Sequence, residues 1–275
     1  MRELTEDEIR RYARHIVLPE IGGVGQSRLL AARVLVIGAG GLGSPLLLYL
    51  AAAGIGTLGV VDFDRVDPSN LQRQILFDEA DAGTCKVVAA ARRIAALNPA
   101  VRVIALAARL DRANARTLVE GWDLVADGCD DPSTRRIVHD ACMAAGKPLV
   151  SASVQGTDGQ ITTYKAFLGP PHPCMRCVFR EVPERGALPS CAQAGVLGPA
   201  AGVVGCLQAV EVIKELLGDA GSSASGTLLL YDAMIPRLER VRIHRRPECE
   251  DGCVHGDDPP DAGRRPAPPS PAIAE

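Results

Sequence analysis

A glycine-rich segment between two short apolar runs constrains the fold of this chain more than any other feature. Residues 34–37 are apolar and short enough for a buried strand, and residues 57–61 form a second run of this kind. Between them lie a glycine cluster and residues 44–53, an alanine- and leucine-rich stretch that we expect to be helical. Glycines let the backbone turn sharply beside a phosphate, and the N–H groups that open the helix then face the anion. The segment therefore predicts half of a doubly wound nucleotide-binding fold.

The candidate nucleotide contacts of this segment are Gly38, Gly40, Gly41, Gly43 and Asp62. Asp62 follows the second apolar run, about twenty residues beyond the turn, where a carboxylate can accept hydrogen bonds from ribose hydroxyls. This pattern indicates a nucleotide but does not identify it, so NAD, FAD and ATP all remain open.

Further strands and helices alternate along the next hundred residues. We expect helices at residues 84–97, 111–120 and 131–145 and strands at 101–106, 122–126 and 148–151. This rhythm predicts a Rossmann-like α/β fold with a mainly parallel sheet.

The rhythm changes after residue 153. Strand-like runs at residues 160–167, 227–232 and 237–244 should add antiparallel strands, and residues 198–217 should form a buried, apolar helix. At the other end of the chain, residues 5–14 should form a short helix, because Thr5 and Glu8 fit a capping box. We expect one domain over residues 1–253, followed by a disordered, proline-rich tail over residues 254–275.

Composition excludes several function classes. A net charge of −3 and 3% aromatic residues give no footprint for nucleic-acid binding. No uninterrupted apolar run reaches about 18 residues, so no membrane span is expected. The charged start lacks the apolar core of a signal peptide, which favours a cytoplasmic protein. Nine cysteines in such a protein favour thiol or metal chemistry over disulfides.

Two cysteine pairs are the candidate metal site. Cys174 and Cys177 have the spacing of a zinc knuckle, and Cys249 and Cys253 are separated by three residues instead of two. Four thiolates suit a structural, tetrahedral Zn²⁺. The alternatives are a redox pair beside unrelated cysteines, or His255 in place of Cys253.

Three polar residues after Asp62 are candidates for binding a triphosphate. Asn70, Arg73 and Lys86 fall where the chain should cross the carboxyl edge of the sheet, and cations there would stabilise a leaving phosphate. Asp130 emerges at the same edge and suits a phosphate-bound Mg²⁺. Asp127 competes with it, although we expect Asp127 to point into the turn. For Asn70, Arg73 or Lys86 taken singly, a solvated polar side chain is the better interpretation, so the prediction rests on their occurring together.

Cys191 lies in a loop with glycine and proline on either side. A buried cysteine is usually an inert small hydrophobe. A cysteine among polar loop residues is more accessible, and its thiolate would be a nucleophile.

The ordered motifs resemble the MoeB/ThiF/HesA group of ubiquitin-activating-like adenylyltransferases, which charge sulfur-carrier proteins. The resemblance covers roughly residues 5–253. It rests on Arg11-Tyr-Ala-Arg14-His, Gly38-Ala-Gly-Gly-Leu-Gly43, Asp62-Phe-Asp64, Ser69-Asn-Leu-Gln-Arg-Gln74, Lys86, Asp130, the two cysteine pairs, Cys191-x-x-Ala-Gly-Val and Tyr231-Asp-Ala.

The resemblance implies a reaction in which MgATP adenylates the Gly-Gly carboxyl terminus of a small ubiquitin-like protein. Asp62 would hold the ribose, Asp130 would bind Mg²⁺, and Arg14 would reach the ATP on a partner subunit, which implies a homodimer. Asn70, Arg73 and Lys86 would hold phosphates. The remaining nucleotide contacts implied by the motifs are Gly41 with its neighbouring glycines, Asp64, Ser69, Leu71, Gln72 and Asp131.

This chain departs from the group in three respects. Asp131 replaces the asparagine that commonly follows the metal-binding aspartate, and it could instead cap the next helix. The last cysteine pair has one extra residue. The stretch after residue 253 is too short for a rhodanese-like domain, so we expect the sulfur to come from a separate donor such as a cysteine desulfurase or a rhodanese.

The pathway stays open among molybdopterin, thiamine, thiolated tRNA and cysteine synthesis, and so does a covalent role for Cys191. The alternative functions are an NAD- or FAD-dependent oxidoreductase and a non-catalytic module that binds a ubiquitin-like protein. Activation of a tRNA-borne carboxylate is a weaker alternative.

Overall fold

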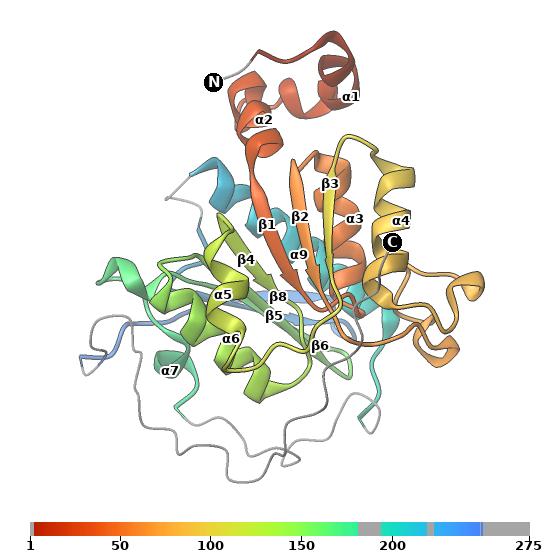
Figure 1. The fold of residues 1–275 in the computed structure, drawn as a ribbon. Helices are drawn as coiled ribbons and strands as arrows, with labels where there is room; N and C mark the ends of the chain where they lie inside the picture. The colour runs from red at the N-terminus through yellow and green to blue at the C-terminus, as the bar shows by residue number, and fades with distance from the viewer. Residues whose placement is uncertain (1–2, 181–193, 219–222, 248, 250–275) are drawn as a thin grey trace.

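The computed structural model describes residues 3–180, 194–218, 223–247 and 249. Its centre is one eight-stranded sheet in the order β3-β2-β1-β4-β5-β6-β7-β8, with helices on both faces (Figure 1). The predicted Rossmann-like fold with a mixed sheet is confirmed.

The first five strands form the parallel half of the sheet. They are β1 (Arg33–Ile37), β2 (Thr57–Val61), β3 (Arg102–Leu106), β4 (Leu124–Asp127) and β5 (Leu149–Gln155). β1 lies between β2 and β4, with Leu35 opposite both Gly59 and Val125. Both faces of β1, β2 and β4 are covered by helices, which is why these strands are almost wholly apolar.

The other three strands form the antiparallel half, as the sequence predicts. They are β6 (Asp158–Tyr164), β7 (Thr227–Asp232) and β8 (Arg237–Arg242). β5 pairs with β6 along its whole length, from Leu149 opposite Tyr164 to Gln155 opposite Asp158. This hairpin makes β5 longer than the predicted strand at residues 148–151.

The α-helices are α1 (Glu6–Ile16), α2 (Gly22–Ala31), α3 (Gly43–Ala53), α4 (Lys86–Leu97), α5 (Ala115–Glu120), α6 (Pro132–Ala144), α7 (Met175–Val178) and α9 (Gly198–Leu217). Short 3-10 helices are η1 (Pro68–Asn70), η2 (Glu79–Asp81) and η3 (Ala166–Leu168). The capping box at Thr5 is confirmed, and α9 has the predicted bounds. The sequence analysis did not predict α2.

Two apolar cores lie on opposite faces of the sheet. One contains side chains of α3, α4 and α9, such as Leu46, Ile94 and Val204. The other contains side chains of α5 and α6, such as Val119 and Val138. In the described part of the chain, no helix is both long enough and apolar enough to cross a membrane.

Tyr12 fastens α1 to the amino edge of the sheet, the end at which the parallel strands begin. Its side chain is 3% exposed, and its hydroxyl accepts a hydrogen bond from Nδ2 of Asn98 at 2.9 Å. Gly54, which ends α3 just before β2, adopts a left-handed conformation with φ of 82°. A Cβ there would lie 2.5 Å from the Tyr12 ring, so the glycine makes room for Tyr12.

We expect Gly54→Ala to destabilise the fold for two reasons. A residue with a side chain loses roughly 1–2 kcal/mol of stability in the left-handed conformation. The methyl group would also displace Tyr12. Gly83→Ala is the matched control, because Gly83 has φ of 80° but no atom within 4 Å of its Cβ position. Urea unfolding should show a clearly larger loss for Gly54→Ala, and equal losses would contradict the steric role of Tyr12.

Candidate functional site

The glycine turn at the carboxyl end of β1 requires glycine at two of its positions. Gly38 has φ of 89°, and a Cβ on Gly43 would lie 2.0 Å from the carbonyl oxygen of Gly38. Asp62, at the end of β2, braces the turn: its Oδ2 accepts from the N–H of Ala39 and its Oδ1 from that of Asp64, both at 2.8 Å. The structure therefore places Asp62 against the predicted glycine turn.

The segment around η1 lies over the glycine turn. The Cβ position of Gly41 is 3.4 Å from Cγ of Arg73, and that of Gly40 is 3.8 Å from Nε2 of Gln74. Gln74 donates to Oδ1 of Asn70 at 2.7 Å. Its Oε1 is buried and has no hydrogen-bond partner among the residues that the structure describes. Since buried polar atoms are normally paired, an unpaired oxygen beside the glycines fits a site for a polar ligand.

The other predicted contacts in this segment have different surroundings. Ser69 donates both its N–H and its hydroxyl to Oδ1 of Asp67, at 2.9 and 2.6 Å. These bonds are the largest reason that the pKa of Asp67 lies below its usual value. Leu71 packs against the apolar core. Gln72 is exposed, and its carbonyl oxygen lies against Gly198, at 2.4 Å from where a Cβ would be.

Lys86 is a buried cation held by one carboxylate. The residue is 5% exposed, and its Nζ lies 2.9 Å from Oδ2 of Asp64. The backbone repeats this pairing, because the N–H of Lys86 donates to the carbonyl oxygen of Asp64 at 3.0 Å. The carboxylate of Asp64 thus gives the buried cation an opposite charge at hydrogen-bonding distance. The sequence predicted both residues for the site but did not predict their contact.

A second strand end carries Asp130. Asp127, the last residue of β4, is fully buried, and its Oδ1 accepts from the N–H of Cys129 at 3.0 Å. It therefore points into the turn, as predicted. Asp130 is exposed, and within the described residues it makes no hydrogen bond or ion pair. Its carboxylate is free for a ligand from solution.

Asp131 is the N-cap of α6. Its Oδ2 accepts from the N–H of Thr134 and from the hydroxyls of Ser133 and Thr134, at 3.0, 2.6 and 2.6 Å. The alternative that Asp131 caps the following helix is therefore what the structure has, and these bonds leave its carboxylate less available to a nucleotide.

Arg135, which the sequence analysis missed, stabilises the turn that follows β4. It donates to the carbonyl oxygen of Cys129, and its Nε lies 3.4 Å from Oδ2 of Asp127. Burial alone would lower the pKa of Arg135, but Asp127 and other neighbours raise it. Burial, aided by Asp127, raises the pKa of the Cys129 thiol well above its usual value, which disfavours its nucleophilic thiolate form.

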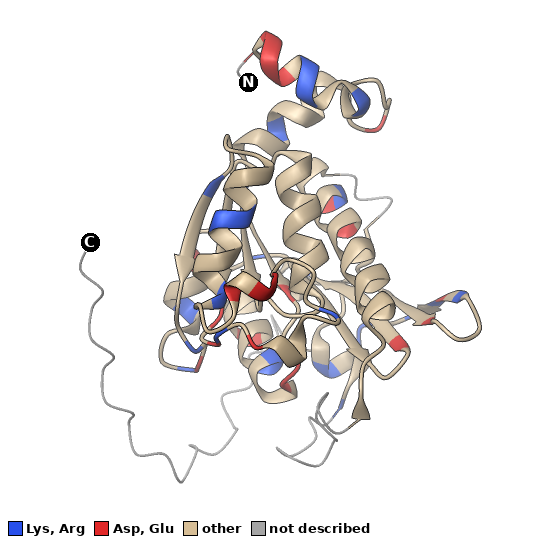
Figure 2. Ribbon diagram, turned by 90° about the vertical axis from the view of Figure 1, so that its right-hand side faces the viewer, with Lys and Arg blue, Asp and Glu red and all other residues tan. Residues whose placement is uncertain are grey.

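Arg14 is not near these residues in its own chain. Figure 1 shows α1 beyond the amino end of the parallel strands. Asp62 and Asp127 lie at the opposite, carboxyl end of these strands. Figure 2 shows this helix with acidic residues near its start and Lys or Arg residues after them. Arg14 and His15 lie in its last turn. Arg14 is exposed and has no hydrogen bond or ion pair with the described residues.

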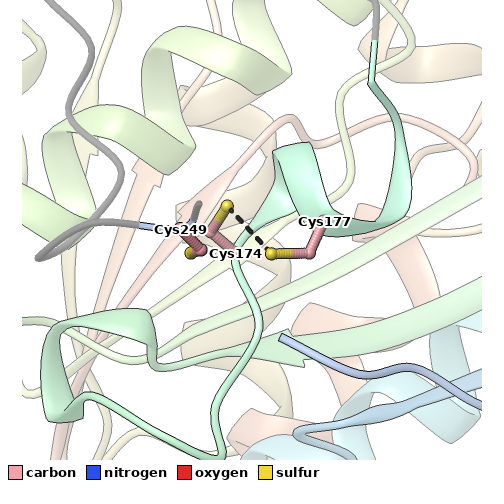
Figure 3. A group of neighbouring side chains, drawn as sticks. All are labelled: Cys174, Cys177 and Cys249. Carbon is pink, nitrogen blue, oxygen red and sulfur yellow. Dashed lines mark hydrogen bonds between the residues drawn. The ribbon is translucent and has the colours of Figure 1, made fainter. Parts of the chain in front are cut away.

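A cluster of three cysteines lies apart from the glycine turn. The sulfur atoms of Cys174, Cys177 and Cys249 lie within 4.8 Å of one another, and those of Cys174 and Cys177 are 3.7 Å apart (Figure 3). The sequence predicted that these residues meet across about seventy positions, and the structure brings them together. Cys253, Cys191, His255 and the predicted tail at residues 254–275 lie outside the described residues.

Backbone and guanidinium groups surround this cysteine cluster. Arg245 donates to the carbonyl oxygens of Ala166, His172 and Cys249 at 2.8–3.0 Å, which joins the C-terminal segment to the loop after β6. Burial alone would raise the pKa of the Cys177 thiol, but it lies below its usual value. The main cause is the N–H of Arg246, which donates to its sulfur at 3.4 Å. Such a thiol gives up its proton to a metal more readily.

Residues 12–251 match the ThiF family. The chain is 52% identical over 247 residues to the "Adenylyltransferase and sulfurtransferase MOCS3" of Bos taurus, with 90% of this chain and 53% of the relative covered. It is 46% identical to the "Sulfur carrier protein adenylyltransferase" of Thermus thermophilus, with 93% of both chains covered. The chain thus spans about half the length of the MOCS3 relative and nearly all of the Thermus one.

The fold also matches solved structures. The crystal structure of E. coli MccB superimposes with a TM-score of 0.76 at 22% identity, over 88% of this chain and 72% of that one. At this identity the similarity shows the shared α/β fold alone.

Proposed function

The chain belongs to the ThiF family, and from this premise we propose that it is an ATP-dependent adenylyltransferase. Its substrate would be the C-terminal Gly-Gly carboxylate of a small ubiquitin-like sulfur-carrier protein. The products would be the acyl adenylate and pyrophosphate. The name of the Thermus relative, which matches along nearly its full length, supports this substrate class.

One observation carries the proposal. The carboxyl ends of the parallel strands hold a glycine turn, Asp62, which accepts a hydrogen bond from that turn, and the aliphatic stem of Arg73 over Gly41. Lys86, which forms an ion pair with Asp64, comes later in the chain than Arg73. Open α/β sheets bind ligands at this edge. An oxidoreductase would use the turn but has no need of these two cations.

The reaction that fits this set needs little proton transfer. A carboxylate oxygen of the carrier attacks the α-phosphorus, the bond from that phosphorus to the bridging oxygen breaks, and pyrophosphate leaves with the electron pair. The protein must align the carboxylate and offset negative charge that develops on the leaving phosphates. Arg73 and Lys86 would supply that charge, and Asn70 and the N–H groups that open α3 would position the nucleotide.

Asp130 would hold Mg²⁺. Its carboxylate is exposed, makes no hydrogen bond or ion pair with the described residues, and offers the oxygen ligands that Mg²⁺ prefers. Bound Mg²⁺ would neutralise phosphate charge. Arg14 would act at the site of a second copy of the chain, since within its own chain it lies at the opposite end of the parallel strands from the proposed site. A homodimer is therefore part of the proposal.

The remaining parts of the proposal concern sulfur and the extent of the domain. A separate protein, such as a cysteine desulfurase or a rhodanese, would donate sulfur to the adenylated carrier. The ThiF match over residues 12–251 supports one catalytic domain over residues 1–253.

The cysteine cluster fits a structural zinc ion. A tetrahedral site with Zn–S bonds of about 2.3 Å requires sulfur atoms about 3.8 Å apart. The 3.7 Å between Cys174 and Cys177 meets this requirement. Cys249 would be the third ligand and Cys253 the fourth. The ion would join the loop after β6 to the C-terminal segment, which Arg245 already joins by hydrogen bonds.

We expect one zinc ion per chain by elemental analysis, and a lower melting temperature after removal of the metal with a chelator. Cys174→Ser should lose the zinc, because it removes a ligand with a fully buried side chain. Cys206→Ser is the control, since Cys206 lies on α9 outside the cluster and is half-buried. Zinc retained by Cys174→Ser, or lost by Cys206→Ser, would contradict the assignment.

The test of the function is ATP–pyrophosphate exchange with candidate carriers. Exchange should require the carrier and should disappear when its final Gly-Gly is removed. Spectra of the purified protein should lack nicotinamide and flavin absorbance. If no Gly-Gly carrier encoded by the same organism supports exchange, the proposed function is wrong.

A further inference from the structure

Two adjacent residues of α6 contact the Cys174–Cys177 knuckle from outside the cysteine cluster. His139 is fully buried, and its Nε2 accepts a hydrogen bond from the N–H of Met175 at 3.1 Å. Asp140 bonds to Arg176. Met175 and Arg176 are the two residues between the paired cysteines. Both intervening positions of the knuckle are therefore fixed by one helix.

The His139 ring has a defined tautomer. Because Nε2 accepts from Met175, the ring proton resides on Nδ1, which lies 2.9 Å from Oδ1 of Asp140 and donates to it. The ring also meets Tyr164 edge-on, with centroids 5.2 Å apart. Both nitrogens are therefore used, and packing from β6 fixes the plane of the ring.

Asp140 joins the two contacts. The same carboxylate that orients His139 receives both terminal nitrogens of Arg176, at 2.8 and 3.1 Å. The Arg176 side chain is 8% exposed, so this bidentate pair lies largely out of water, where an orienting effect is strong. His139 and Asp140 thus hold the N–H of Met175 and the side chain of Arg176, and these two residues lie between the proposed ligands Cys174 and Cys177.

We infer that His139 and Asp140 are positioning residues for the metal: through Met175 and Arg176 they hold Cys174 and Cys177 at ligand spacing before an ion binds. This inference rests on the proposed zinc site. The 3.7 Å between the two sulfur atoms is the spacing that two ligands of one zinc ion require. Residues that orient metal ligands from outside commonly contribute roughly 10–100-fold to metal affinity.

Two substitutions test the inference. Asp140→Asn keeps the shape but removes the charge that holds both His139 and Arg176. His139→Phe keeps a ring against Tyr164 and removes both nitrogens. Asp81→Asn is the matched control. Asp81 lies on η2, away from the cysteine cluster, and its buried carboxylate is paired with Arg92.

The measurement is the rate at which zinc-loaded, full-length protein transfers its metal to a chromogenic chelator, together with the melting temperature of the metal-free protein. Asp140→Asn and His139→Phe should release zinc about tenfold faster than the wild type. Asp81→Asn should lower the melting temperature and leave the release rate unchanged.

Wild-type release rates in both α6 variants would overturn the inference. Equal acceleration by Asp81→Asn would overturn it too, because the effect would then reflect general stability. If His139→Phe does not fold, Asp140→Asn alone decides. A wild-type protein that holds no zinc would refute the metal site and this inference with it, whereas ATP–pyrophosphate exchange tests the adenylation separately.

Discussion

Asp130→Ala is expected to abolish ATP–pyrophosphate exchange while leaving the fold intact. The carboxylate is exposed and makes no hydrogen bond or ion pair within the described residues, so no contact of the fold is lost with it. The turn itself is held by other groups, namely Asp127 on the N–H of Cys129 and Arg135 on its carbonyl oxygen. We expect a loss of roughly 10²–10³-fold or more, as for the removal of one preorganised charge-stabilising group.

Glu120→Ala is the matched control for this prediction. Glu120 is also an exposed carboxylate, but it lies at the end of α5, just before β4 begins, at the opposite edge of the sheet. Its ion pair with Arg116 on the surface is worth roughly 0–1 kcal/mol, so exchange should be near wild type. If Asp130→Ala keeps most of its exchange activity at saturating MgATP, the magnesium assignment is wrong.

Local sequence signals were sufficient to predict most of the fold. The apolar strands, the glycine turn and α9 lie where the sequence predicts them, because burial on all sides leaves a plain apolar run. α2 could not be predicted, because glycines 22, 23 and 25 open it and no side-chain cap marks its start. β5 is longer than predicted, since its second half is stabilised by pairing with β6 and not by its own sequence.

The site was predictable where residues end strands, and not where packing brings residues together. Asp62 and Asp130 follow apolar runs, and parallel topology brings such ends to one edge. The Lys86–Asp64 pair, the unpaired Oε1 of Gln74 and the contact of His139 with Met175 depend on tertiary packing. No local pattern encodes them. The meeting of Cys174, Cys177 and Cys249 was predictable because the spacing of the cysteines in the sequence is typical of metal ligands.

Arg14→Ala is expected to reduce exchange severely even though Arg14 lies far from the nucleotide site of its own chain. Tyr12, two residues earlier, is buried against Asn98 and Gly54 at the amino edge, so α1 cannot bring Arg14 to the carboxyl edge without leaving its place. A guanidinium delivered by a partner subunit would act as an arginine finger does, worth on the order of 10³-fold or more. The measurement is exchange by the purified variant with a saturating carrier.

Mixed dimers decide whether Arg14 acts in the partner's site. Co-expressed Arg14→Ala and Asp130→Ala chains should form dimers in which one site combines an intact Asp130 with the partner subunit's intact arginine. About half of the dimers would be mixed and one of their two sites active, so about a quarter of the wild-type rate should return. Co-expressed Asp130→Ala and Lys86→Met chains should recover nothing, because both defects lie in residues that each chain supplies to its own site. No recovery in the first pair, with mixed dimers verified by two affinity tags, would show that Arg14 does not act across the subunits.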